Sequence, residues 1–105
     1  MKANDSNKDE DIAQQIRTQL GSTPDVEQLT VKGHLLQMHV TEGFYNRLAV
    51  DRERGRKLVL ALMQRMKTLT GSKDVTVWIY CKNEKVMEGQ VKEWGGDNVK
   101  YFYDL

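Results

Sequence analysis

The sequence predicts an α+β fold: a two-layer sandwich in which two helices pack on one face of a mostly antiparallel sheet of about five strands. Two segments carry apolar residues at helical spacing, and most other apolar residues alternate with polar ones, as they do in strands. The expected order is α-β-β-α-β-β-β. Short turns between consecutive strands favour hairpins and therefore antiparallel pairing. A chain of 105 residues fits one domain.

The first helix is expected to begin near Asp9, after a flexible polar N-terminal tail over residues 1–8. Apolar residues then recur every four positions, at Ile12, Ile16 and Leu20. Gly21 follows this stripe and suits a helix C-terminus, because glycine readily adopts a left-handed backbone. We therefore predict a single α+β domain over residues 9–105.

Two strands are predicted next. Apolar and polar residues alternate at 29–32 and again at 36–41, and Lys32 and Gly33 between them form a tight turn. Phe44 and Leu48 then stand four residues apart, which indicates a helical turn or a short irregular connection.

The second helix is predicted over residues 51–70. Its apolar line consists of Leu58, Leu62, Met66 and Leu69. Asp51 is a good N-cap residue, and Gly71 is placed to end the helix. We expect the apolar line to cover the sheet, which leaves the opposite sheet face open.

Three strands are predicted in the last third of the chain, at 75–81, 86–94 and 99–103. Turns at 82–85 and 95–98 separate them. Gly89 interrupts the alternation of the middle strand and indicates a β-bulge. The last strand is a candidate sheet edge for pairing with another chain.

Aromatic residues concentrate in these strands. Trp78 and Tyr80 alternate with Val77 and Ile79, so the two rings are expected on the open face if the valine and isoleucine face the helices. Cross-strand ring pairs that stabilise the sheet are one interpretation. The other is a binding surface for a protein partner or for a second copy of the chain. Its candidate residues are Trp78, Tyr80, Trp94, Tyr101 and Tyr103.

A basic cluster at the start of the second helix is the alternative candidate site, formed by Arg52, Arg54, Arg56 and Lys57. It is typical of a solvated helix face with internal ion pairs, and it is also compatible with a nucleic-acid-associated regulator. The chain has 16 basic and 15 acidic side chains, and its formal charge of +1 argues against a broad attraction to polyanions.

The sequence carries no sign of catalysis or of a cofactor. Cys81 is the single cysteine, so it cannot form an intramolecular disulfide, and its register with Val77 and Ile79 indicates a small buried side chain. His34 and His39 are five residues apart and would project to opposite faces of one strand, so we expect no metal site. No glycine-rich phosphate loop or nucleophile elbow is present. We therefore predict a non-catalytic binding or assembly module.

No apolar run approaches the ~20 residues that a transmembrane helix needs. The start, MKANDSNKDED, lacks the apolar stretch of a signal peptide. The expected location is the cytoplasm if Met1 is the native start. It is the periplasm or the cell envelope if a leader has been removed.

The segment VKGHLLQMHVTEG, followed by a charged amphipathic helix and then KDVTVWIY, resembles the small BON-type envelope domains in element order and in its glycine turn. The resemblance implies an envelope-associated domain that attaches to a ligand or a membrane. The sequence departs from the BON pattern where SKDV replaces the usual glycine-valine before the last strand, and where two further strands follow.

Overall fold

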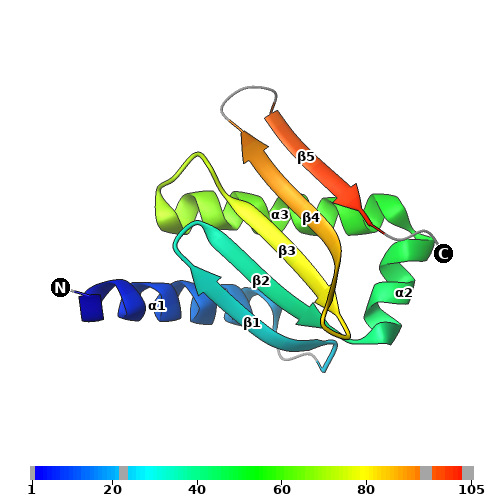
Figure 1. The fold of residues 1–105 in the computed structure, drawn as a ribbon, viewed down its shortest axis with the longest axis horizontal. Helices are drawn as coiled ribbons and strands as arrows, with labels where there is room; N and C mark the ends of the chain where they lie inside the picture. The colour runs from blue at the N-terminus through cyan, green and yellow to red at the C-terminus, as the bar shows by residue number, and fades with distance from the viewer. Residues whose placement is uncertain (1, 22–23, 93–95, 103–105) are drawn as a thin grey trace.

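A computed structural model describes residues 2–21, 24–92 and 96–102. Within these residues the predicted α+β fold is confirmed, with three helices and five strands (Figure 1). The helices are α1 (Lys2–Leu20), α2 (Glu42–Val50) and α3 (Arg52–Thr70). The strands are β1 (Val26–Lys32), β2 (Leu35–Val40), β3 (Thr76–Cys81), β4 (Glu84–Lys92) and β5 (Gly96–Tyr101).

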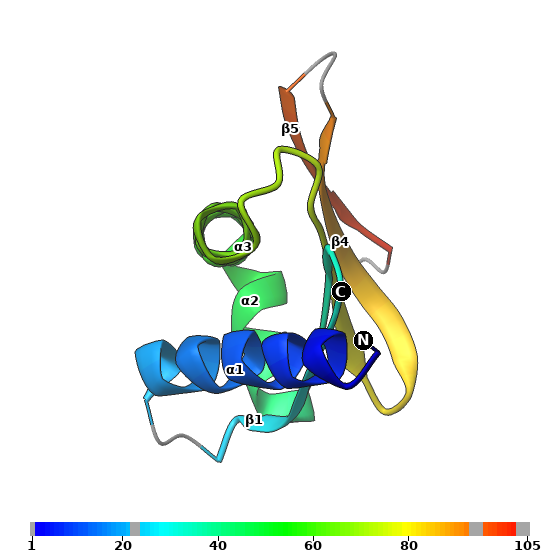
Figure 2. The same cartoon turned by 90° about the vertical axis from the view of Figure 1, so that its left-hand side faces the viewer.

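The five strands form one sheet in the order β1-β2-β3-β4-β5, so β5 lies at an edge, as expected for the last strand. Pairing is antiparallel except between β2 and β3, which are parallel. This exception follows from connectivity, because α2 and α3 together carry the chain back across the sheet before β3 begins. Figure 2 shows all three helices on the same side of the sheet.

The first helix is longer than predicted. It begins at Lys2, so residues 2–8, which we expected to form a tail, are helical. These residues contain no proline or glycine, and extending an existing helix is far easier than starting one. The predicted C-terminus is confirmed, because Gly21 has a φ of 83° and its N–H donates to the carbonyl of Arg17.

The second helix, α2, was predicted only as a helical turn or an irregular connection. It is a nine-residue helix, with Thr41 as its N-cap accepting a hydrogen bond from the N–H of Phe44. Tyr45 and Leu48 are its buried residues. The structure therefore has three helices rather than the two expected, because the apolar pair in this segment packs against the core.

The third helix confirms its prediction at both ends. Asp51 accepts a hydrogen bond from the N–H of Arg54, and Gly71 ends the helix with a φ of 71°. The buried residues of α3 include Leu62 and Met66, which confirms that this side of the helix covers the sheet.

The turn between β3 and β4 lies where it was predicted but is shorter than the expected 82–85, since β4 begins at Glu84, and the predicted bulge is misplaced. Lys82 and Asn83 both have positive φ, as a tight two-residue hairpin requires. The irregularity of β4 lies at Val86, which falls between the pairs Ile79–Met87 and Tyr80–Lys85. Because of this extra residue, two consecutive side chains of β4, Val86 and Met87, are buried.

Gly89 is therefore not the bulge that we predicted. It pairs in register with Val77 on β3 and with Val99 on β5. A Cβ at this position would overlap Cγ1 of Val59 and would lie 3.0 Å from Sδ of Met63, both on α3. The absence of a side chain at Gly89 lets α3 approach the sheet closely.

We predict that Gly89→Ala destabilises the protein by about 1–3 kcal/mol, because the added methyl group overpacks a core that is already filled. Urea unfolding measures the change. Gly43→Ala is the matched control, since a Cβ on that α2 residue meets nothing within 4 Å. Equal stabilities of the two variants would contradict the close approach of α3.

Candidate functional site

We call the sheet face that points away from the helices the open face. In β2 and β3, buried residues alternate with half-exposed ones. The buried set, which includes Val77 and Ile79, lies on the helix side. The half-exposed set forms the centre of the open face and includes Gln37, His39, Thr76, Trp78 and Tyr80. The structure thus places Trp78 and Tyr80 on the face where the sequence predicted them.

Three rings of the open face contact one another. The rings of His39 and Tyr80 are stacked, with centroids 4.8 Å apart and planes 10° apart. Trp78 meets Tyr80 edge-on, with centroids 6.4 Å apart and planes at 70°. The indole N–H of Trp78 is shielded and has no hydrogen-bond partner within the described part of the chain. Ring contacts, rather than a hydrogen bond of the indole, therefore hold the orientation of Trp78.

Lys85 crosses the open face beside Trp78. Its Nζ lies 4.4 Å from the centre of the Trp78 ring and 5.3 Å from the centre of the Phe102 ring. The same ammonium is 2.9 Å from Oε1 of Glu88, and both side chains of this ion pair are largely buried, with 32% and 21% exposed. Two rings and one carboxylate therefore surround a single cation.

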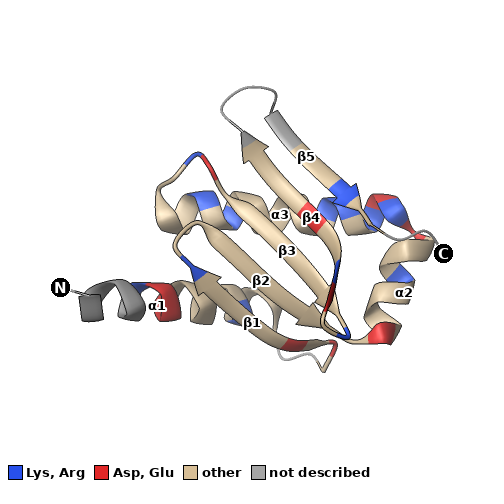
Figure 3. Cartoon of the chain, in the orientation of Figure 1, with Lys and Arg blue, Asp and Glu red and all other residues tan. Residues whose placement is uncertain are grey.

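Charge on the open face lies outside β2 and β3. Strands β2 and β3 contain no Asp, Glu, Lys or Arg, and they carry neither charge colour in Figure 3. Charged side chains of the open face include Lys32 on β1, Lys85 and Glu88 on β4, and Lys100 on β5. Glu88 and Lys85 pair directly with Trp78 and Tyr80. The face therefore has an uncharged aromatic centre on β2 and β3, with charged side chains on the strands to either side.

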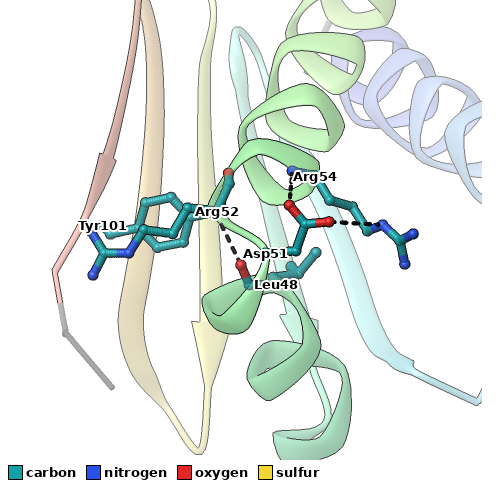
Figure 4. Close-up of polar contacts among 5 residues, drawn as sticks. All are labelled: Leu48, Asp51, Arg52, Arg54 and Tyr101. Carbon is teal, nitrogen blue, oxygen red and sulfur yellow. Dashed lines mark hydrogen bonds and ion pairs between the residues drawn. The ribbon is translucent and has the colours of Figure 1, made fainter.

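Tyr101 does not belong to the open face, contrary to our expectation. It pairs with the buried Met87 and packs against the core on the helix side. Its hydroxyl lies 2.8 Å from the carbonyl oxygen of Arg52 and 3.4 Å from that of Leu48 (Figure 4). The hydroxyl also fills the space that a Cβ of Gly55 would take. Through these hydrogen bonds, Tyr101 connects β5 to the end of α2 and the start of α3.

The neighbours of Tyr101 also act on its ionisation. Burial raises the pKa of the Tyr101 phenol, and the nearby Arg52 guanidinium acts in the opposite direction. The guanidinium carbon of Arg52 lies 5.0 Å from the centre of the Tyr101 ring. The phenol therefore stays protonated and keeps its hydrogen-bond donor.

Two other predicted aromatic residues, Trp94 and Tyr103, lie outside the described residues. The basic cluster is exposed on the first turns of α3. Arg52 lies over the Tyr101 ring, and Arg54 is 3.8 Å from the Asp51 carboxylate, so two of its four cations already make contacts within the chain.

Cys81 is buried, as expected. Burial raises the pKa of its thiol, and the Glu42 carboxylate raises it further, while Lys82 acts in the opposite direction. Among the described residues, no group of three or more His, Cys, Asp or Glu side chains could hold a metal ion. In the same part of the chain, no helix combines the length and the apolar character needed to cross a membrane.

Comparisons with known proteins give no relative: no protein-family model, no curated protein and no solved structure matches this chain.

The residues that contact the rings of Trp78 and Tyr80 or the ammonium of Lys85 include four that were not among the predicted site residues: His39, Lys85, Glu88 and Phe102. The sequence contained a signal for His39: it alternates with the apolar residues Met38 and Val40, so its side chain belongs to the face opposite theirs. Alternation also separates Phe102 from Tyr101. The prediction included Tyr101 among the binding residues, but Tyr101 pairs with the buried Met87 and therefore lies on the helix side.

We predict that Tyr101→Phe lowers the free energy of unfolding by about 1 kcal/mol, because the hydrogen bond to the Arg52 carbonyl is lost. Chemical denaturation measures the change. Tyr80→Phe removes a hydroxyl from the open face and serves as the control, with a change below about 0.5 kcal/mol. A Tyr101→Phe variant as stable as this control would contradict the fastening role of the hydroxyl.

We also predict that the Cys81 thiol of the folded protein reacts with dithionitrobenzoate at least about tenfold more slowly than in the urea-unfolded chain, because it is buried and its thiolate is disfavoured. The rate should continue to rise with pH beyond the ordinary thiol pKa, where the rate of an unperturbed thiol levels off, since the pKa of Cys81 is raised. Equal rates in the folded and unfolded states at pH 7.5 would contradict this prediction.

Proposed function

We propose that this chain is a non-catalytic binding module whose open face contacts another protein surface, either a second copy of the chain or a different protein. The observation that carries the proposal is the charge pattern of the open face, in which the aromatic centre on β2 and β3 is uncharged and the strands to either side carry charged residues. Protein interfaces share this pattern, because charged residues are depleted at their centre and aromatic residues are enriched there.

The rings at the centre are also held in place before any partner arrives. Tyr80 is stacked on His39 and touches the edge of Trp78. Side chains that are already ordered lose little conformational entropy on binding, so more of their contact energy contributes to affinity. Tryptophan and tyrosine are also the residues that most often dominate binding energy at protein interfaces.

The exposed edge of β5 offers a second mode of contact. The N–H of Phe102 donates to the carbonyl of Val86 on β4. Because amides in a strand alternate in direction, the backbone groups of Val99 and Tyr101 point away from β4, towards the free edge. Such groups are able to pair with a strand of another chain.

The basic cluster supports the alternative, nucleic-acid-associated function less well. Arg52 and Arg54 are engaged with Tyr101 and Asp51, which leaves Arg56 and Lys57 as the two exposed cations of the cluster for which the structure gives no such contact. Nucleic-acid binding usually needs several cations directed at phosphates. The open face is therefore the better candidate.

We predict that Trp78→Ala and Tyr80→Ala each weaken association by about tenfold or more, as residues at an interface centre do. Sedimentation equilibrium of the full chain from micromolar to millimolar concentration measures self-association. For a different partner, a photo-crosslinking residue at Gln37 would form an adduct in an extract of the native host. Purified wild-type chain would compete for that adduct, and the Trp78→Ala variant would not.

Lys57 on the exposed side of α3 is the control position for the crosslinker. A chain that is monomeric at millimolar concentration, and whose Gln37 position gives no adduct beyond those obtained at Lys57, would contradict the proposal. Denaturation curves of both alanine variants separate a loss of contact from a loss of folding.

A further inference from the structure

The contacts of Lys85 point to the chemistry of the partner. The rings of Trp78 and Phe102 and the carboxylate of Glu88 form a cage, and the ammonium of Lys85 lies between them. Aromatic ring faces and a carboxylate both attract a cation, and the attraction increases when the site is partly shielded from water. The structure thus contains a cation site together with one occupant.

We propose that the cage binds a lysine side chain of the protein partner, and that Lys85 is an internal competitor which this lysine displaces. The inference rests on the proposed function of the open face and specifies what the partner presents there. An ammonium group is the chemistry argued for, because an ammonium already occupies the cage at 4.4 Å and 5.3 Å from the two ring centres.

Exchange of Lys85 for a partner lysine is feasible because the backbone that supplies Trp78 and Glu88 does not have to move, and Phe102, directly after β5, is held by the hydrogen bond from its N–H to the carbonyl of Val86. Trp78 lies on β3, and Lys85 and Glu88 lie on the paired strand β4, so the backbone positions are set by the sheet. Lys85 is near the β3–β4 turn and its side chain is 32% exposed, so its flexible stem has room to swing into solvent. Phe102, with 46% exposed, already offers part of its ring to an incoming group.

Competition by Lys85 weakens the binding of any single cation, since the cage is open for only part of the time. A partner therefore has to combine its lysine with further contacts on the uncharged centre of the open face. This arrangement favours a protein surface over a free amine in solution.

The test uses the full chain and Nα-acetyl-lysine amide as the probe. Lys85→Ala should bind this probe about tenfold more tightly than the wild type does, because the internal competitor is gone. Titration of the Trp78 indole N–H signal in ¹H–¹⁵N NMR spectra gives the affinity. The signal is assigned with a Trp94→Phe variant, which retains Trp78 as the single tryptophan.

Three controls make the result specific. Nα-acetyl-norleucine amide has the same apolar stem without the charge and should not bind. Lys100→Ala removes a lysine on the neighbouring strand, opposite Glu88, and should leave the wild-type affinity unchanged. Adding Glu88→Gln to Lys85→Ala should reduce the affinity gained by several-fold, while dispersed spectra verify that each variant is folded.

Equal affinities of the wild type and Lys85→Ala for the lysine probe would overturn the proposal that the cage binds a partner lysine. Equal binding of the lysine and norleucine probes would also overturn it. These outcomes are distinguishable from a failure of the proposed function. A chain that associates through Trp78 and Tyr80 without binding the lysine probe would retain its interface and lose this inference. If Lys85→Ala binds the lysine probe but the chain associates with no protein, the cation site is retained and the proposed function is lost.

Discussion

The packing of α3 against the centre of the sheet is the contact on which the rest of the structure depends. Val59, Met63 and Met66 on this helix are fully buried, and Gly89 on β4 provides the space that the side chains of Val59 and Met63 need. Because side chains of a strand alternate between faces, covering one face with α3 assigns every second residue of β3 and β4 to the core. The remaining residues, including Trp78 and Tyr80, are left on the open face.

The open face has to remain compatible with water while it carries aromatic rings. Lys85 contributes to this in the structure, because its ammonium lies over the rings of Trp78 and Phe102. Glu88 fixes the ammonium in place. Lys85 shields the rings in the free protein, and in our proposal it is also the side chain that a partner displaces. The cation site is therefore a part of the proposed binding face.

Tyr101, which directly precedes Phe102, lies on the helix side of the sheet. Its hydroxyl bonds to the carbonyl of Arg52 beside Gly55, where any larger residue would exclude it. This contact ties the edge strand β5 to the start of α3. It also explains why an aromatic residue in the last strand is structural here, although its neighbours in sequence suggested a binding role.

Local patterns predicted much of the fold. Asp51 and Gly71 marked both ends of α3, Gly21 marked the end of α1, and alternation placed Trp78 and Tyr80 on the open face. These features depend on residues close together in the chain, so capping chemistry and side-chain period are sufficient to predict them.

Features that join distant segments were decided only by the tertiary structure. The parallel pairing of β2 with β3 depends on how α2 and α3 cross the sheet. The role of Gly89 depends on the approach of Val59 from α3. The cage depends on the bulge at Val86, which sets the register that brings Lys85 towards Trp78 and Phe102. The amino-acid sequence by itself determined the helix ends, the strand alternation and the supply of rings. Which rings meet, and which cation lies between them, was settled by packing, because such contacts join residues far apart in the chain whose relative positions no local rule specifies.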